Sequence, residues 1–461
     1  MSQYPTQSLC PICLARIPAQ RVWRGQEVFL EKHCAAHGFF QTVIWKGAPA
    51  MAGWHRPKLS SRPAEAEHGA KQDCPFDCGL CPKHAQRSCT VILEVTQRCD
   101  LGCPVCYAAS GPKGDDPSPA VVAGWFERLG QTSPGANIQL SGGEPTLRDD
   151  LPALVELGRR AGFEFIQINT NGLRLAREPG YAQALKNAGA ASVFLQFDGV
   201  NDDVYRWLRG RALWEIKQAA VAACALAGLG VVLVPTLVPG VNTHAVGAIL
   251  EAALAWYPAV RGVHFQPMSY FGRHPGRPTD SRRLTLPELM HAIETQSDGW
   301  FKVEHFRPPG CEHALCSFHA QYLLSEHGRP RPLHPLPMAG QSVAPIKAEE
   351  GARRAIDFVA RQWAAPLSGS TAASGPSCAC KEKIPESSNT SPKNSISLDD
   401  FLAAAQSRTF CVSAMAFQDV WNLDLERVQG CCIHVLAGDG RLIPFCLYNL
   451  TAADGRALYR P

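Results

Sequence analysis

Apolar runs and helix-forming stretches alternate along the middle of the chain, between residue 90 and about residue 305. Alternating strands and helices predict a parallel sheet with right-handed crossovers. We predict strands at 90–96, 136–141, 163–169, 192–197, 230–237 and 262–267, with helices between them, for example at 149–160 and 181–187. The predicted fold class is therefore α/β, a partial TIM-like (β/α)6 barrel at 90–328 whose site lies at the carboxyl ends of the strands.

One stretch, 219–238, carries no charge over about the length of a membrane span. Its first half is rich in alanine and ends near Gly228, whereas the residues after Gly230 are mainly β-branched. A helix followed by a buried strand explains the same hydropathy, so we expect no transmembrane segment. The N-terminus lacks a basic stretch followed by an apolar core. We therefore expect no signal peptide and a cytoplasmic protein.

Cysteine groups precede the predicted barrel. Residues 1–60 predict an N-terminal rubredoxin-like or zinc-like module, and residues 61–89 predict a loop that holds an auxiliary cluster. The chain has 461 residues, of which 46% are apolar, and a formal net charge of +4, so nothing favours a nucleic-acid partner. Its 19 cysteines fall at metal-like spacings, which indicates reduced intracellular metal sites rather than disulfides.

The sequence changes character after the predicted barrel. Residues 329–398 are rich in proline and serine and are interpreted as a linker or insert, with one helix predicted at 348–363. Within this insert, Cys378 and Cys380 are interpreted as a chance occurrence in an unstructured segment rather than as a labile metal or redox pair. Residues 399–461 regain regular patterns, beginning with an amphipathic stretch at 398–405, and predict a C-terminal auxiliary iron–sulfur domain.

Three cysteines, Cys99, Cys103 and Cys106, follow the first predicted strand at the spacing C-x3-C-x2-C. Three thiolates on one loop can hold three irons of a [4Fe–4S] cluster, which normally takes four cysteines. The fourth iron is then open to a substrate or cofactor. A zinc loop is the alternative interpretation, because C-x2-C pairs are common in zinc ribbons.

The sequence Ser-Gly-Gly-Glu-Pro at 141–145 ends the second predicted strand and favours the cluster. Two glycines leave the backbone bare, and Glu144 adds one carboxylate that can hold the ammonium group of an amino-acid-like ligand. Alone this loop is a weak turn signal. Its position one strand after the cysteine loop makes the combination specific.

The two motifs together resemble the radical SAM superfamily. That resemblance implies that the three cysteines ligate the cluster and that S-adenosylmethionine (SAM) binds its open iron. Cleavage of SAM would give a 5′-deoxyadenosyl radical that abstracts hydrogen from the substrate, with a flavodoxin or ferredoxin type of reductant. The residues expected to contact SAM are Gly142, Gly143, Glu144, Pro145, Asn171 and Asp198, of which Asn171 and Asp198 are equally compatible with helix caps or turns.

Three further groups of ligands are predicted. Cys10, Cys13, Cys34 and His37 suit zinc or mononuclear iron, more simply as a structural staple than as a reactive centre. Cys74, Cys78 and Cys81 repeat the C-x3-C-x2-C spacing and predict an auxiliary [4Fe–4S] cluster, with Cys89 as its fourth ligand or as a core residue. A second auxiliary cluster is predicted at Cys311, Cys316, Cys432 and Cys446, and Cys224 is predicted to be plain core.

The order of all these parts resembles the tetraether lipid synthase-like radical SAM proteins, including a bacterial branch labelled radical SAM (seleno)protein. The resemblance covers residues 8–325 and 400–452, and the insert at 329–398 departs from it. It implies attack on an unactivated C–H bond of an apolar or lipid substrate, with formation of a carbon–carbon bond. A maturase that modifies a peptide is the alternative enzyme, and a non-catalytic metal scaffold or electron carrier is the third interpretation.

Overall fold

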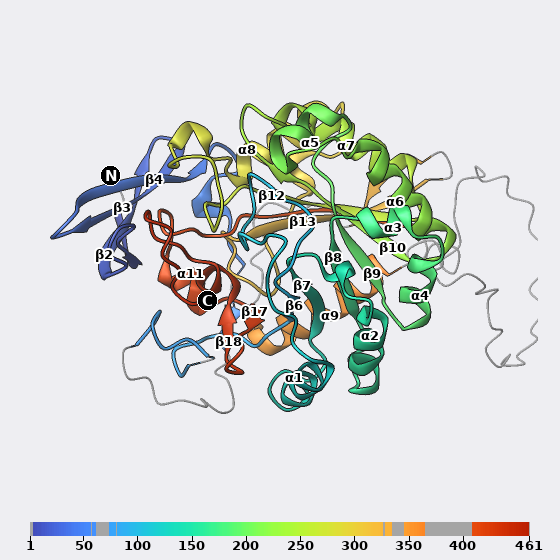
Figure 1. Cartoon of the computed structure of the whole chain (residues 1–461). Helices are drawn as coiled ribbons and strands as arrows, with labels where there is room; N and C mark the ends of the chain where they lie inside the picture. The colour runs from blue at the N-terminus through green and yellow to red at the C-terminus, as the bar shows by residue number, and fades with distance from the viewer. Residues whose placement is uncertain are drawn as a thin grey trace, which may run out of the picture.

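A computed structural model describes residues 3–56, 58–60, 73–79, 81–325, 328–333, 345–364 and 408–460 of the chain. The predictions at Cys378, Cys380 and 398–405 lie outside these residues. The structure contains a twelve-stranded sheet, a separate four-stranded sheet and a two-stranded ribbon. Figure 1 shows the four-stranded N-terminal sheet at one end of the molecule, with C-terminal residues lying between it and the large sheet.

Six neighbouring parallel strands form the centre of the large sheet and confirm the partial barrel predicted from the sequence. They are β6 (Thr90–Thr96), β7 (Asn137–Gly142), β8 (Ile166–Thr170), β9 (Ser192–Gln196), β10 (Gly230–Val234) and β12 (Val260–Pro267), with β11 (Thr236–Leu237) beside β12. The helices between and after them are α1 (Pro119–Thr132), α2 (Leu151–Arg160), α3 (Leu173–Arg177), α4 (Tyr181–Asn187), α5 (Asp202–Arg209), α6 (Trp214–Leu226), α7 (Val246–Ala255) and α8 (Leu286–Gln296).

Each barrel strand alternates between two kinds of surroundings, because successive side chains point to opposite faces. On β7, Ile138 and Leu140 belong to the main hydrophobic core, whereas Gln139 and Ser141 line an internal cavity. The same alternation places Gln196 of β9 on the cavity side. The polar residues within these apolar runs therefore mark the inner face of the barrel.

C-terminal residues extend the large sheet at both edges. Strand β16 (Thr409–Met415) is parallel to β12 and antiparallel to β13 (Ser317–Leu324), which pairs with β14 (Pro330–Pro332). At the other edge, β17 (Ile433–Leu436) is parallel to β6 and antiparallel to β18 (Leu442–Pro444). The short helices α11 (Leu425–Gln429) and α12 (Phe445–Tyr448) flank β17 and β18. The sheet thus continues into residues that the sequence had assigned to a separate C-terminal domain.

The N-terminal sheet consists of four antiparallel strands, β1 (Gln3–Leu9), β2 (Arg16–Arg24), β3 (Glu27–Cys34) and β4 (Gly38–Lys46). Buried polar contacts attach it to the C-terminal residues. The Arg21 guanidinium donates from Nε to Asp424 at 2.8 Å, and the Lys32 ammonium donates to the Val420 carbonyl at 2.7 Å. The N-terminal module is therefore fixed against the C-terminal part of the chain.

Helix α9 (Ala348–Trp363) lies within the segment predicted to be a linker, at the residues where a helix was predicted. It follows β15 (Ile346–Lys347), which pairs with β5 (Lys58–Leu59). The helix contacts β7, β10, β12 and β16, and Trp363 packs on the ring of Phe194 at 5.2 Å between centroids. This part of the segment is thus a wall of the barrel interior rather than a spacer.

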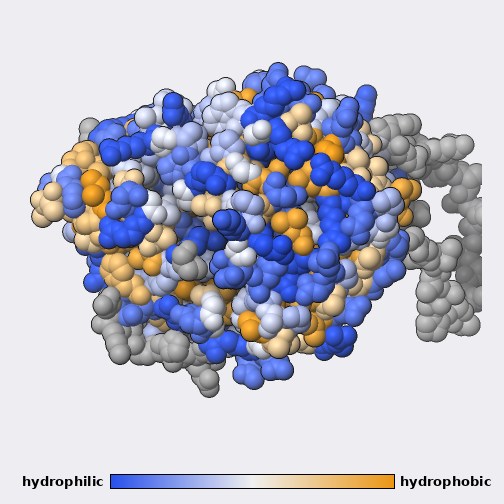
Figure 2. All heavy atoms as spheres, viewed as in Figure 1, coloured by the Kyte–Doolittle hydropathy of each residue, from blue (hydrophilic) through white to orange (hydrophobic). Residues whose placement is uncertain are grey.

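The uncharged stretch at 219–238 covers the end of α6 and the strand β10, as predicted. Among the described residues, no helix has the length and apolar character needed to cross a membrane. The face drawn in Figure 2 mixes hydrophilic and hydrophobic residues.

Candidate active site and metal centres

The loop with Cys99, Cys103 and Cys106 follows β6 and lines an internal cavity of about 1650 Å³. Backbone hydrogen bonds hold it at both ends, from Cys99 N to the Gly111 carbonyl at 2.6 Å and from Cys106 N to the Arg273 carbonyl at 2.9 Å. Burial raises the pKa of Cys99 to about 12. A thiolate there needs a compensating positive charge, which bound iron supplies.

The glycine loop packs directly against the start of the cysteine loop. Gly143 N donates to the Thr96 carbonyl at 2.8 Å, and Glu144 N donates to the Arg98 carbonyl at 2.7 Å. A Cβ atom on Gly142 would lie 2.0 Å from the Thr96 oxygen, and one on Gly143 would lie 2.0 Å from the Arg98 oxygen. Only glycine therefore allows the two loops to approach this closely.

The carboxylate of Glu144 is held by several hydrogen bonds within the protein. It accepts hydrogen bonds from Thr146 N at 3.0 Å, Thr146 Oγ1 at 2.7 Å, Thr170 Oγ1 at 2.7 Å and Asn171 N at 2.6 Å. It lines the cavity, and the four hydrogen bonds that it accepts join the glycine loop to the end of β8. Pro145, another predicted SAM contact, is buried and does not line the cavity. Among the described residues Oε2 accepts from Asn171 N alone, so the contact of Glu144 with an ammonium group stays a prediction.

Asn171 lines the cavity and also links two loops, because its Nδ2 donates to Asp100 Oδ1 at 2.7 Å. Asp198 differs from its expected role as a SAM contact. It is fully buried, does not line the cavity and forms two hydrogen bonds with Arg209, at 2.7 and 2.8 Å. The reason is that the Asp198 carboxylate, just after β9, pairs with the buried Arg209 guanidinium eleven residues later in the chain.

Arg209 and Lys217 are two residues of this site that the sequence analysis missed. The Arg209 guanidinium lines the cavity, donates to the Val105 carbonyl of the cysteine loop at 3.0 Å and lowers the pKa of Cys103 against the larger effect of burial. The Lys217 ammonium donates to the Asn171 carbonyl at 2.6 Å, and burial lowers its pKa to about 7. A signal existed for Lys217, which shares the buried face of α6 with Ala220 and Cys224, but not for Arg209, which ends a helix with three other charges.

The inner face of the barrel offers polar atoms to a ligand beside the glycine loop. Asn169 lines the cavity and donates to Ser141 Oγ at 3.3 Å, and its Oδ1 is buried without a hydrogen-bond partner among the described residues. His264 lies farther along the cavity, donates to or accepts from Ser413 at 2.9 Å, and is kept neutral because burial lowers its pKa to about 4. An orphaned carbonyl, bare glycine backbone and three thiols together fit SAM and its cluster.

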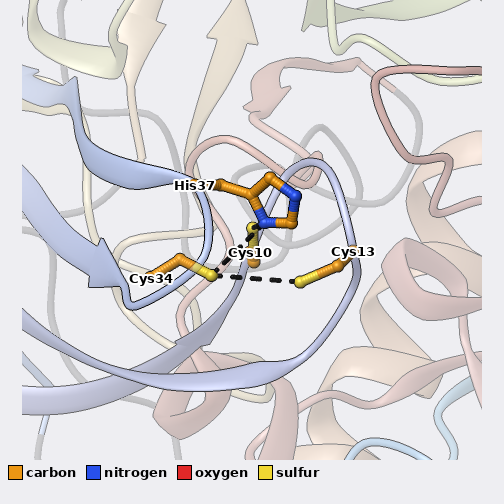
Figure 3. Close-up of side chains that lie close together, drawn as sticks. All are labelled: Cys10, Cys13, Cys34 and His37. Atoms are coloured by element: carbon orange, nitrogen blue, oxygen red, sulfur yellow. Dashed lines mark hydrogen bonds between the residues drawn. The ribbon is translucent and has the colours of Figure 1, made fainter.

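The four predicted N-terminal ligands come together, as Figure 3 shows. Cys10 and Cys13 lie in the turn after β1, and Cys34 and His37 lie between β3 and β4. The Cys34 sulfur is 3.9 Å from the Cys13 sulfur and 3.5 Å from His37 Nδ1, and all four ligand atoms lie within 4.8 Å of one another. This compact set of three sulfurs and one nitrogen suits a single tetrahedral ion.

The auxiliary cysteines regroup relative to the sequence-based assignment. Cys89 lies with Cys311 and Cys432, with all three sulfurs within 4.8 Å and the Cys89 and Cys432 sulfurs 3.0 Å apart. It is therefore not in one group with Cys74, Cys78 and Cys81. The reason is the pairing of β17 with β6, which brings Cys432 beside the residue that precedes β6.

The predicted set Cys311, Cys316, Cys432 and Cys446 is divided between two places. Cys316 and Cys446 fall outside the compact group, and the thiols of Cys446 and Cys316 instead help burial to raise the pKa of Cys431. Cys431 is thus a candidate ligand outside the predicted set. Cys224 is buried in the main hydrophobic core, as predicted.

Comparisons with known proteins agree with this geometry. The family model of the radical SAM superfamily matches residues 93–253, and that of the HMPTM N-terminal zinc ribbon domain matches residues 3–46. A relative from Methanocaldococcus jannaschii, named 7,8-dihydro-6-hydroxymethylpterin dimethyltransferase, is 34% identical over 476 residues, which cover 96% of this chain and 93% of the relative.

Two further matches are partial. A probable GTP 3′,8-cyclase of Methanothermobacter thermautotrophicus is 30% identical over 37% of this chain and 55% of its own length. The crystal structure of Streptococcus suis SuiB bound to precursor peptide SuiA has a TM-score of 0.40 and 12% identity, over 47% of this chain and 46% of that chain.

The fold, the cysteine loop and the glycine loop define a radical SAM enzyme, which uses SAM and a [4Fe–4S] cluster. Within that superfamily, the chain belongs to the family of the Methanocaldococcus jannaschii dimethyltransferase. The additional cysteine groups and the zinc ribbon indicate auxiliary metal sites.

Proposed function

We propose that this enzyme abstracts a hydrogen atom from an unactivated C–H bond of a large, mainly apolar substrate, and that a lipid chain is the first candidate. The observation that carries the proposal is the cavity. Its volume of about 1650 Å³ exceeds the roughly 300–1,000 Å³ of ordinary small-molecule sites, so space remains beside SAM. Apolar residues from all parts of the barrel line it, namely Phe194, Val234, Met268, Phe306, Phe318, Phe358, Val359, Trp363, Met415 and Phe417.

When bound, SAM and the cluster held by Cys99, Cys103 and Cys106 supply a 5′-deoxyadenosyl radical that takes the hydrogen atom. The residues of this chain hold the two loops that would bind the cluster and SAM. Glu144 fastens the glycine loop to β8, and Arg209 holds the Val105 carbonyl of the cysteine loop. The apolar part of the cavity wall lies beside these loops, where contact with an apolar substrate would displace water from the reacting atoms. A flavodoxin or ferredoxin type of protein is the reductant we expect.

Methyl transfer to a reduced pterin is the second candidate, because the relative that matches the whole chain is named for that activity. One residue of the cavity suits such a substrate. Glu312 is a buried carboxyl group that lines the cavity, and burial raises its pKa. The pyrimidine edge of a pterin presents adjacent N–H groups, which can donate hydrogen bonds to such a carboxyl group.

Deuterium transfer distinguishes the two candidates. The anaerobically reconstituted enzyme is reduced and given SAM with either a phospholipid carrying deuterated chains or a deuterated 6-hydroxymethyl-7,8-dihydropterin. We expect deuterium in 5′-deoxyadenosine from the lipid, and none in the Cys99→Ala variant. Deuterium from the pterin alone would replace the first candidate by the second. Equal SAM cleavage with and without each compound, with neither deuterium transfer nor methylated pterin, would reject both candidates.

A variant of the cavity wall separates substrate size from SAM cleavage. Val359 of α9 lines the cavity, so Val359→Trp would shorten the space available to a chain. We expect this variant to lose activity on long chains more than on short ones while substrate-free SAM cleavage persists. Equal loss at every chain length would contradict the proposed position of the substrate.

A further inference from the structure

Cys74, Cys78 and Cys81 lack the fourth ligand that the sequence analysis assigned to them. Cys89 lies in the other group, with its sulfur 3.0 Å from that of Cys432. The three remaining cysteines line a small internal cavity, which is closed by Val428 and Gln429 of α11, by Pro444 and by one more polar side chain, His84. A search for the missing ligand therefore leads to this histidine.

The hydrogen bonds of His84 leave one ring nitrogen available. Its Nε2 lies 2.7 Å from the Cys431 carbonyl, a contact that requires the ring to donate the Nε2 proton. In the neutral ring Nδ1 then carries the lone pair, and no hydrogen bond to Nδ1 occurs within the described part of the chain. Histidines that ligate metals usually donate their second ring nitrogen to a backbone carbonyl or a carboxylate in this way.

The surrounding contacts hold the histidine at the cysteine loop. Its backbone N donates to the Cys81 carbonyl at 2.8 Å, so His84 lies in the turn that follows the third cysteine. The His434 ring lies against it, with the two Nε2 atoms 3.2 Å apart, and Ser88 Oγ is 3.0 Å from His434 Nδ1. These contacts fix the orientation of the His84 ring.

The cysteine loop itself is anchored by distant parts of the chain. The Tyr459 hydroxyl donates to the Pro75 carbonyl at 2.6 Å and accepts from Cys78 N at 3.0 Å, and Arg16 donates to the Cys74 carbonyl at 3.1 Å. The loop, the histidine and the C-terminus thus form one packed unit. Such support from surrounding residues is typical of a preorganised ligand set.

We propose that Cys74, Cys78, Cys81 and His84 are the four ligands of one [4Fe–4S] cluster. A cluster fits better than a single ion because the three sulfurs do not gather within 4.8 Å, unlike the N-terminal set in the same described part of the chain. With all four irons ligated by protein, this site cannot bind SAM and is left to carry electrons. The hydrogen bond from His84 to the Cys431 carbonyl links this cluster to the neighbouring group of cysteines.

Nitrogen hyperfine coupling tests this ligand set. The full-length chain with Cys99, Cys103 and Cys106 replaced by serine and His37 by cysteine, prepared without SAM, removes the radical SAM cluster, its cofactor and the N-terminal histidine ligand from the spectra. We expect the reduced protein to show coupling from a histidine nitrogen, and His84→Cys to abolish that coupling while iron and sulfide content are retained. His84→Ala should lose the coupling and make one cluster labile. His264→Ala, a buried histidine elsewhere, is the matched control and should change neither.

Two outcomes would overturn the proposal. One is nitrogen coupling that survives in His84→Cys, which would place the histidine ligand elsewhere. The other is tightly bound zinc, with loss of zinc rather than of iron and sulfide in the triple variant Cys74→Ser, Cys78→Ser and Cys81→Ser. Because none of these measurements uses substrate or SAM, their result is independent of the proposed reaction.

Discussion

The substitution Glu144→Gln tests whether the glycine loop is held by this carboxylate. In the structure, one carboxylate oxygen accepts from Thr146 N, Thr146 Oγ1 and Thr170 Oγ1, and the other accepts from Asn171 N at 2.6 Å. Glutamine has one acceptor oxygen, which can keep the first three bonds. Its amide nitrogen then faces the Asn171 N–H, so that donor is left buried and unpaired.

The magnitude follows from those contacts. A hydrogen bond to a charged group is worth about 1.5–3 kcal/mol, and a buried donor without a partner costs about 1–3 kcal/mol. Burial raises the pKa of Glu144, so removing the charge recovers part of the cost of burying it. We therefore expect a loss of about 3 kcal/mol in the free energy of unfolding rather than the full sum. Because Asn171 also holds Asp100 of the cysteine loop, SAM affinity should fall as well.

The assay compares urea denaturation midpoints of the apoprotein and SAM dissociation constants of the reconstituted enzyme, both without oxygen. Glu156→Gln is the matched control, since Glu156 is exposed on α2 and pairs with Arg160 at 3.5 Å. This control should change stability by about 0.5 kcal/mol or less. If Glu144→Gln behaved like the control in both measurements, the fastening role of Glu144 would be refuted.

Three further predictions concern buried charges and the N-terminal metal. Burial lowers the pKa of Lys217 to about 7, so between pH 7 and 10.5 the unfolded chain binds more protons than the folded chain and stability rises with pH. Lys217→Met should flatten this rise in the denaturation midpoint. An unchanged pH profile would count against the buried, neutral state of Lys217. Asp198→Asn leaves the Arg209 guanidinium buried without its counter-charge, which should cost about 3–5 kcal/mol in urea denaturation, and a cost below about 1 kcal/mol would show that the pair is not needed. Cys34→Ser should remove one metal ion per chain in elemental analysis while the radical SAM cluster keeps its absorbance, and full metal retention would argue against the N-terminal site.

Features that depend on local sequence could be predicted. The six central strands were found because each apolar run is bounded by polar or glycine residues, and the cysteine and glycine loops lie next to each other because their strands are sequential neighbours. The helix α9 was found from its own pattern, although its place against the inner face of the sheet was not. Its flanking proline- and serine-rich composition pointed to a linker instead.

Of the contacts between distant segments, the sequence placed Cys311 with Cys432, which do lie together, but it missed their third partner, Cys89. Cys89 meets Cys432 only because β17 pairs with β6 in parallel register, and no local pattern specifies that pairing. Asp198 at a strand end looks the same in sequence whether it binds a ligand or a buried cation. Its partner Arg209 decides the matter, and the geometry that unites them depends on the fold.

The central claim is that Cys99, Cys103 and Cys106 ligate three irons and leave the fourth to SAM. Low-temperature electron–nuclear double resonance on the reduced, oxygen-free enzyme with SAM labelled by ¹⁵N at its amine tests this claim most directly. The account predicts coupling of the labelled nitrogen to the cluster, absent when Cys99, Cys103 and Cys106 are replaced by serine. A spectrum that is identical with and without labelled SAM, in protein that carries its full complement of iron, would contradict it.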